Sequence, residues 1–334
     1  MKRLSILTAI ILAAAALMAS FQNCYACTGI TLKAKDGSTV VARTIEWAAS
    51  DNDCRWAVVP RGHRWKSFIP GGGTGRSFTN VYGYVGVSVV QDELMMEGMN
   101  EKGLSAGLFY FPDYGRYEEY SKANYETNIS DFQLVSYILG RCATVDEVKA
   151  EIARVHIHGF DPRSSTVHWR FAEPSGRQIV LEIIDGKCVF YENNLGVLTN
   201  SPSFDWQLTN LNNYVNLLPG RTEPHTIGNM SLSSFGGGSA MIGLPGDFTP
   251  PSRFVRAAFF QSTAPQKPDA EGSVFTAFHI LGSMEIPIGA QFPVDGTPAD
   301  IPSATQCTCV TDMSGLKFYY RSMYDGGIRC IDLK

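Results

Sequence analysis

The sequence predicts a single α+β domain in which helices pack on antiparallel sheets. Short β-type runs separated by turn signals cover most of the chain, a pattern typical of hairpins and strand meanders. Four or five helical segments interrupt these runs in pairs. No internal repeat and no change in composition divides the 334 residues, so we expect one domain over residues 27–334.

A leader precedes this domain. Lys2 and Arg3 are followed by an uncharged apolar run over residues 4–18, which is typical of a secretory signal peptide. The run is shorter than the about 20 apolar residues that a membrane helix needs. We therefore expect residues 1–26 to be removed, and the protein to be periplasmic or secreted without a stable membrane anchor.

The predicted cut lies between Ala26 and Cys27. Small residues over 16–20 offer a second place for cleavage, and lipidation of Cys27 would be a third outcome. A lipidated cysteine is usually preceded, three positions earlier, by an aliphatic residue. Here that position holds Cys24, which disfavours lipidation of Cys27. The mature chain is therefore expected to begin with a cysteine that has a free amine.

Charge and cysteine content exclude several function classes. Without Lys2 and Arg3 the basic residues fall from 28 to 26, against 32 acidic ones, and no basic run remains. Nucleic-acid binding is therefore not expected.

Eight cysteines become seven if Cys24 leaves, and an odd number in an exported protein indicates one reactive thiol. The sequence leaves open whether the other six are paired or buried. Cys307 and Cys309 lack the partners of a zinc site, so no metal or cofactor is expected.

The first predicted element is a hairpin of residues 27–33 and 39–47. Counting from a turn centred on Asp36-Gly37 places Cys27 beside Glu46. Arg43 and Glu46 are three residues apart, so they cannot both face Cys27 on a regular strand. A bulge or a change of one residue in the loop would bring Arg43 to Cys27 instead.

The remaining elements follow from turn, cap and alternation signals. Residues 60–80 are rich in glycine and basic residues and are predicted to form a flexible surface loop; a phosphate-binding loop is disfavoured, because a β-type run follows. Strands are predicted at 81–90, 94–99, 104–111, 166–172, 178–184, 188–192, 195–198, 307–313, 316–322 and 328–333. Helices are predicted at 130–140 and 144–155, capped by Ser130 and Thr144, and at 206–217, 253–261 and 274–284, with an irregular segment at 219–252.

A cysteine at the mature N-terminus would combine a nucleophile with its own base. A thiol has a pKa near 8.5 and an α-amine near 7.7–8.0, so the amine can take the thiol proton during attack on a carbonyl. A guanidinium such as that of Arg43 would favour the thiolate. Asn200, at the end of a short apolar run, is a suitable oxyanion donor because its amide is uncharged. Arg253 lies in the first turn of a helix, where the macrodipole disfavours a cation, so a partner such as a carboxylate is expected.

Several segments together resemble the choloylglycine hydrolase family, which includes bile salt hydrolases and penicillin V acylases. They are CTGIT at 27–31, ARTIEW at 42–47, MNEKGL with AGL at 99–108, GVLTNSP at 196–202, GLPGD and SRFVR within 243–256, and FHILG at 278–282. The matches run in order over nearly the whole mature chain, and their joint pattern is specific.

The resemblance implies a four-layer αββα sandwich of the N-terminal-nucleophile type that hydrolyses linear amides without a metal. It assigns the catalytic Cys to Cys27, the neighbouring Arg to Arg43 and the oxyanion Asn to Asn200. It assigns the late Arg to Arg253, and an acid to Glu46, where many members have Asp. It also suggests a homotetramer, and the leader resembles that of the family's Gram-negative exported branch.

The substrate is a small amide with an apolar acyl group, but the sequence leaves its identity open. Tyr110 follows Ala106-Gly107-Leu108 near a position where penicillin V acylases tend to have Tyr and bile salt hydrolases often have Asn. Trp47 and the aromatic residues 109–111 are expected either to line an acyl pocket or to be ordinary core side chains. N-acyl homoserine lactones are an alternative substrate. A Cys–His hydrolase and a non-catalytic exported binding protein are the rival functions.

Overall fold

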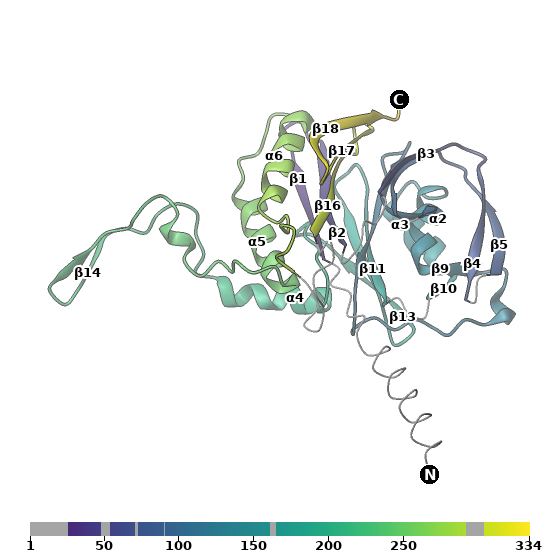
Figure 1. Cartoon of the computed structure of the whole chain (residues 1–334), viewed down its shortest axis with the longest axis horizontal. Coiled ribbons are helices and arrows are strands. Elements are labelled where there is room, and N and C mark those ends of the chain that lie inside the picture. The colour runs from purple at the N-terminus through teal and green to yellow at the C-terminus, as the bar shows by residue number, and fades with distance from the viewer. Residues whose placement is uncertain (1–25, 48–53, 71–72, 90, 161–164, 292–303) are drawn as a thin grey trace, which may run out of the picture.

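Two antiparallel sheets lie face to face at the centre of the molecule, and a pair of helices covers the outer side of each (Figure 1). The computed structural model describes residues 26–47, 54–70, 73–89, 91–160, 165–291 and 304–334. The four layers confirm the predicted αββα sandwich. The leader predicted over residues 1–26 lies outside the described residues apart from Ala26.

The first sheet has the strand order β1-β2-β16-β17-β18. Its strands are β1 (Cys27–Lys33), β2 (Thr39–Trp47), β16 (Ala304–Asp312), β17 (Lys317–Ser322) and β18 (Asp325–Asp332). Helices α5 (Pro250–Thr263) and α6 (Ala270–Gly282) pack on it. The apolar side chains of Ile30, Val40, Phe254 and Leu281 are buried between this sheet and its helices.

The second sheet has the order β13-β12-β11-β8-β7-β6-β3. Its strands are β3 (Arg55–Val59), β6 (Tyr84–Val89), β7 (Gln91–Asn100), β8 (Ser105–Tyr110), β11 (Val167–Ala172), β12 (Gln178–Ile184) and β13 (Lys187–Glu192). Helices α2 (Leu134–Leu139) and α3 (Val145–Ile152) cover it. The larger apolar core lies here and includes Val87, Ile138 and Trp169.

The predicted hairpin of β1 and β2 is confirmed, but its register differs by one residue from the expected one. Cys27 pairs with Ile45, and Lys33 pairs with Thr39. The loop has five residues, closed by a hydrogen bond from Ala34 N to the Ser38 oxygen, so the turn is centred on one residue rather than between two. This shift places Arg43 on the same face as Cys27 and Glu46 on the opposite face.

Some other sequence predictions are wrong. Residues 60–80 hold a hairpin, β4 (Arg64–Ile69) and β5 (Gly73–Thr79), because Trp65 and Phe78 pair across it and are both buried. Residues 195–198 form no strand; only Leu198 makes a bridge, to Gly29.

Several helix starts also differ from the predictions, including that of α6, which begins at Ala270 rather than at residue 274. Ser130 precedes a 3₁₀ turn (Asp131–Gln133) and makes no side-chain cap, whereas Thr144 caps α3 as predicted, by accepting from Glu147 N. Helix α5 begins at Pro250, three residues earlier than expected, because proline fits the first helical positions. The helix predicted at 206–217 divides into α4 (Phe204–Asn210) and a 3₁₀ turn (Leu211–Tyr214).

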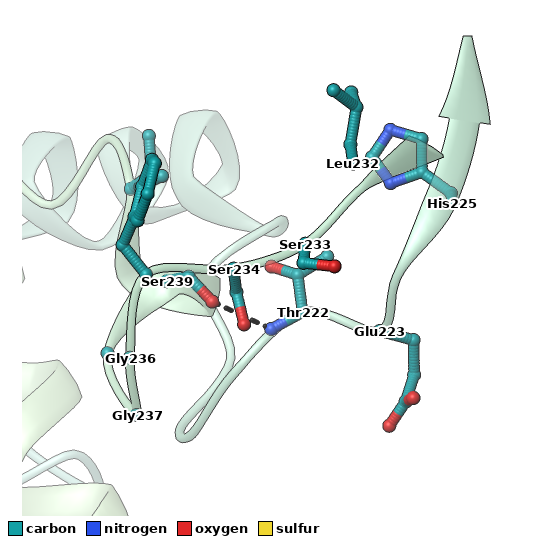
Figure 2. A pocket seen from close by; sticks show the side chains of 12 residues that line it. Thr222, Glu223, His225, Leu232, Ser233, Ser234, Gly236, Gly237 and Ser239 are labelled. Carbon is teal, nitrogen blue, oxygen red and sulfur yellow. Dashed lines mark hydrogen bonds between the residues drawn. The ribbon is translucent and has the colours of Figure 1, made fainter. Parts of the chain in front are cut away.

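Residues 218–246, here called the arm, project away from the layers (Figure 1). The arm carries a short hairpin of β14 (His225–Ile227) and β15 (Met230–Leu232). It encloses a hollow whose wall comes from the arm alone (Figure 2). None of the predicted site residues lines this hollow, so it is not the candidate active site.

Two further findings concern membranes and cysteines. No helix within the described ranges has the length and apolar character to cross a bilayer. No disulfide joins the cysteines of those same ranges; the sulfur atoms of Cys54 and Cys307 lie 3.4 Å apart without a bond.

Candidate active site

Cys27 is the first residue of β1 and lies between the two sheets. Its side chain is 2 % exposed while Ala26 remains attached. The pairing with β2 extends one residue before the strand, since Glu46 N donates to the Ala26 oxygen at 3.0 Å. Ala26 is itself buried. The predicted cleavage bond is therefore held inside the fold beside the candidate nucleophile.

Arg43 is the cation that contacts the thiol. Its Nη2 lies 2.7 Å from Cys27 Sγ, and its Nη1 donates to the Leu108 carbonyl. Its Nε donates to the Thr44 carbonyl, and the guanidinium lies 4.0 Å from the centre of the Phe109 ring. Burial alone would lower the pKa of Arg43, but the neighbouring anionic groups hold that pKa above its usual value. The guanidinium is thus a fixed, charged donor to sulfur.

Asn200 and Arg253 hold the backbone of Cys27. Cys27 N donates to Asn200 Oδ1 at 2.8 Å, and Arg253 Nη2 donates to the same oxygen at 2.7 Å. Arg253 also donates to the Cys27 carbonyl and to Thr28 Oγ1. Neutral oxygen atoms therefore occupy the place of the expected carboxylate partner. Burial lowers the pKa of Arg253, and the negative charge of Glu46 is the largest effect that opposes this lowering.

Glu46 lies on the helix side of β2, away from the thiol. Its Oε1 accepts a hydrogen bond from Thr305 Oγ1 at 2.7 Å. Burial raises the pKa of Glu46 to about 7, against the opposing effect of Arg253. With Ala26 attached, burial therefore favours the protonated carboxyl group of Glu46 more than it would be favoured in solvent.

Tyr110 joins the site through its backbone. Its carbonyl accepts from Asn200 Nδ2 at 2.8 Å, and its backbone also hydrogen bonds to the Cys27 sulfur. Its side chain packs against the larger core. The ring that lies on Arg43 is that of Phe109, one residue earlier. From the sequence, Phe109 was named only as one of the aromatic residues 109–111, although the alternation of β8 places it on the inner face together with Gly107.

Burial raises the pKa of the Cys27 thiol in this state. The charge of Arg43 is the largest opposing effect, followed among the cations by that of Arg253. An α-ammonium formed at Cys27 N would add a further positive charge next to sulfur and favour the thiolate.

Histidine takes no part in the contacts of Cys27. The buried His168 lies 3.1 Å from Glu182 Oε1 through Nδ1 and 3.0 Å from the Thr199 carbonyl through Nε2. Both ring nitrogens are therefore engaged away from the thiol, which disfavours the Cys–His hydrolase. Among the residues that the structure describes, no group of three or more His, Cys, Asp or Glu side chains could hold a metal ion.

A model of the family described as "Linear amide C-N hydrolases, choloylglycine hydrolase family" matches residues 27–334. The chain belongs to the choloylglycine hydrolase family. The match begins at Cys27, the residue around which the site is built.

Individual relatives agree with this assignment. The chain is 33% identical over 316 residues to a bile salt hydrolase/transferase of Clostridium perfringens, with 92% of each chain covered. It is 28% identical to a penicillin V acylase of Pectobacterium atrosepticum, over 88% of this chain and 77% of the relative. A solved mutant of the Clostridium perfringens conjugated bile acid hydrolase superposes with a TM-score of 0.79 at 30% identity, covering 92% of each chain.

These comparisons confirm the αββα fold of the N-terminal-nucleophile type and the class of enzyme. The protein is an amidase of the linear amide C–N hydrolase type. The family assignment therefore excludes the non-catalytic binding protein as the main function.

Proposed function

We propose that the protein hydrolyses the amide bond of conjugated bile salts or penicillin V, with Cys27 as nucleophile and its own α-amine as base. One observation carries the proposal. Cys27 Sγ lies 2.7 Å from Arg43 Nη2, while the nitrogen of the same residue lies 2.8 Å from Asn200 Oδ1. Sulfur and nitrogen of one residue are thus both fixed by side chains that suit this chemistry.

The reaction follows from these contacts. The α-amine takes the thiol proton as Sγ attacks the amide carbon, and a tetrahedral oxyanion forms. The Asn200 amide, whose oxygen holds Cys27 N, and the Tyr110 backbone, which hydrogen bonds to the thiol, are the neutral groups that would stabilise the oxyanion. The ammonium then returns the proton to the leaving amine, and a thioester remains. Water hydrolyses the thioester with the amine again as base, which releases the acid and restores the thiol.

Removal of residues 1–26 is the step that activates this site. In the chain with Ala26, Cys27 N belongs to a peptide bond and cannot act as a base. Because Ala26 is buried, its departure frees space directly beside Cys27. The new ammonium also gives Glu46, with its raised pKa, a positive partner. We place the mature enzyme in the periplasm or outside the cell, without a lipid on Cys27.

Conjugated bile salts are the first substrate class to consider, since the bile salt hydrolase/transferase named above shares more identity with this chain than the penicillin V acylase does. Penicillin V is the second, and N-acyl homoserine lactones are the alternative within the same chemistry. All three present an apolar acyl group, which suits the buried aromatic surroundings of Cys27, such as Phe109.

Side-by-side assays test this proposal. The mature chain is incubated with glycine- and taurine-conjugated bile salts, with penicillin V and with long-chain acyl homoserine lactones, and amine or lactone release is measured. We expect activity on at least one of them and its loss, by 10³-fold or more, roughly as for other removed nucleophiles, in Cys27→Ala. Cys188→Ala, at an exposed cysteine, is the matched control and should keep full activity. Full activity in Cys27→Ala would overturn the mechanism.

The proposal extends to a homotetramer. The arm projects away from the layers (Figure 1) and exposes the side chains of Ile227, Met230, Phe235 and Ile242. Apolar side chains exposed together on a projecting segment are typical of surfaces that bind another chain. A second copy of this chain is the partner that the family resemblance suggests.

A further inference from the structure

A buried cluster of charges lies behind Arg43, between the two sheets. Glu97 on β7 accepts a hydrogen bond from Arg170 Nη2 on β11 at 2.6 Å. The other carboxylate oxygen of Glu97 lies 3.7 Å from Arg43 Nη1. None of the three side chains is more than 1 % exposed. The reaction outlined above uses Arg43 but gives no role to Glu97 or Arg170.

Two glycines make room for this cluster. A Cβ atom at position 107 would collide with the Glu97 carboxylate. A Cβ atom at position 29 would lie 3.1 Å from Arg170 Nη1 and 3.0 Å from Phe109 Cζ. Both glycines lie on strands that face the other sheet, where larger side chains would otherwise fill the space. The backbone on both sides is therefore shaped to admit an ion cluster.

The charges in the cluster do not cancel by themselves. Arg43 and Arg170 contribute two positive charges and Glu97 one negative charge, so one positive charge is left in a buried place. The Cys27 sulfur, 2.7 Å from Arg43, is the group in direct contact that can supply the missing negative charge. The other charged or titratable groups that interact with Cys27 or Arg43 are Glu46, Arg253 on α5, and Cys307 and Cys309 on β16.

We propose that Glu97 and Arg170 are positioning residues that determine how much of the Arg43 charge is neutralised, and thereby set the ionisation of the Cys27 thiol. This proposal rests on the proposed role of Cys27 as nucleophile. Arg43 keeps its place without Glu97, because the Leu108 and Thr44 carbonyls and the Phe109 ring also hold it. Changes at Glu97 and Arg170 therefore act mainly through charge.

The two residues should shift the thiol in opposite directions. Glu97→Gln removes a negative charge and leaves Arg43 more available to sulfur, so the thiol pKa falls. Arg170→Gln leaves Glu97 to neutralise Arg43, so the thiol pKa rises. The double variant removes both charges and should return close to the parent. Each single change is expected to alter the alkylation rate of Cys27 at pH 6 on the order of tenfold, which corresponds to about one pKa unit.

The rate of iodoacetamide alkylation between pH 5 and 9, on the mature chain, is the direct measurement. Trypsin releases Cys27 in the peptide CTGITLK, residues 27–33, so mass spectrometry follows this cysteine alone. The exposed Cys188 is the internal reference and should not change. Glu192→Gln and Arg177→Gln, which break a surface ion pair, are the matched control variants and should leave Cys27 unchanged.

Opposite shifts in the two single variants, with restoration in the double variant, support the proposal. Equal shifts in one direction, or no shift, overturn it while a fast-reacting Cys27 in the parent keeps the nucleophile hypothesis intact. A parent Cys27 that reacts no faster than Cys188 at pH 6 contradicts the nucleophile hypothesis itself. If either single variant does not fold, the folded single variant and the double variant still decide the sign.

Discussion

Glu46 shows how one side chain can act differently before and after cleavage. In the chain that keeps Ala26, it is buried on the helix side of β2, and its pKa is raised from 4.5 to about 7. After cleavage an ammonium would occupy the position of that nitrogen and would favour the carboxylate. The Glu46 carboxylate also accepts a hydrogen bond from Thr305 on β16, which joins β2 to its neighbour through side chains.

This pKa shift predicts a pH-dependent stability in a chain that begins at Ala26. The protonated form of Glu46 stabilises the fold fully below the unfolded pKa of about 4.5, and this contribution is lost as pH rises through about 7. Glu46→Gln should remove this loss, which is on the order of 3 kcal/mol between pH 4 and 8. Urea unfolding at both pH values measures it.

Glu101→Gln, at a more accessible carboxylate paired with Arg61, is the control and should keep the pH dependence of the parent. If the Glu46→Gln chain loses as much stability as the parent over the same range, the carboxyl group is not protonated in the fold and the assignment is wrong.

At the scale of elements, local patterns predicted most of what the structure contains. Alternation and turn residues gave the β1–β2 hairpin and the closing strands, and Thr144 marked the start of α3. The predicted register of this hairpin differs by one residue from the observed register, because a four-residue turn and a five-residue turn can contain the same Asp-Gly signal. Residues 60–80 were predicted to be a loop because they are rich in glycine. The hairpin found there depends on the pairing of Trp65 with Phe78, which composition does not reveal.

Contacts between elements could not be derived from the sequence alone. Arg43, Asn200 and Arg253 were named from residue chemistry and from the family resemblance, and the structure brings all three to Cys27. Glu97 and Arg170 were missed, because their role depends on how the two sheets stack. The signal that could have found them is a charged residue next to apolar residues within a strand, as Glu97 follows Leu94-Met95-Met96 in β7 and Arg170 lies between Trp169 and Phe171 in β11.

The arm is the element whose removal should change the oligomeric state of the protein. Ala240 N donates to the Gly220 oxygen at 3.3 Å, so the two ends of the arm lie close together. Residues 221–239 can therefore be replaced by a short Gly-Ser turn without straining α4 or α5. We expect this change to lower the assembly from a tetramer to smaller species while the melting temperature of the layers stays similar, as measured by light scattering and calorimetry.

A control with the same charge and length is the full arm with Ile227→Ser and Met230→Ser, which should weaken the assembly less than the deletion. If the shortened chain keeps the mass of the parent assembly, or the parent is a monomer, the arm does not bind a second copy.

For the molecule as a whole, the sandwich is complete with Ala26 attached, whereas the proposed activity depends on where the chain is cut. The sandwich holds Cys27 at its centre through both backbone groups and through sulfur. Ala26 fills the adjacent space and ties up the nitrogen that would act as base. The αββα layers therefore hold the side chains around Cys27 in place, and we propose that cleavage after Ala26 converts this arrangement into a working site.

The most direct test of this account is the intact mass of the active protein purified from the exported fraction. The account predicts a chain that begins at Cys27 with an unmodified amine. An active chain that begins at Ser20, Phe21, Gln22 or Ala26, or that carries a lipid on Cys27, would contradict it.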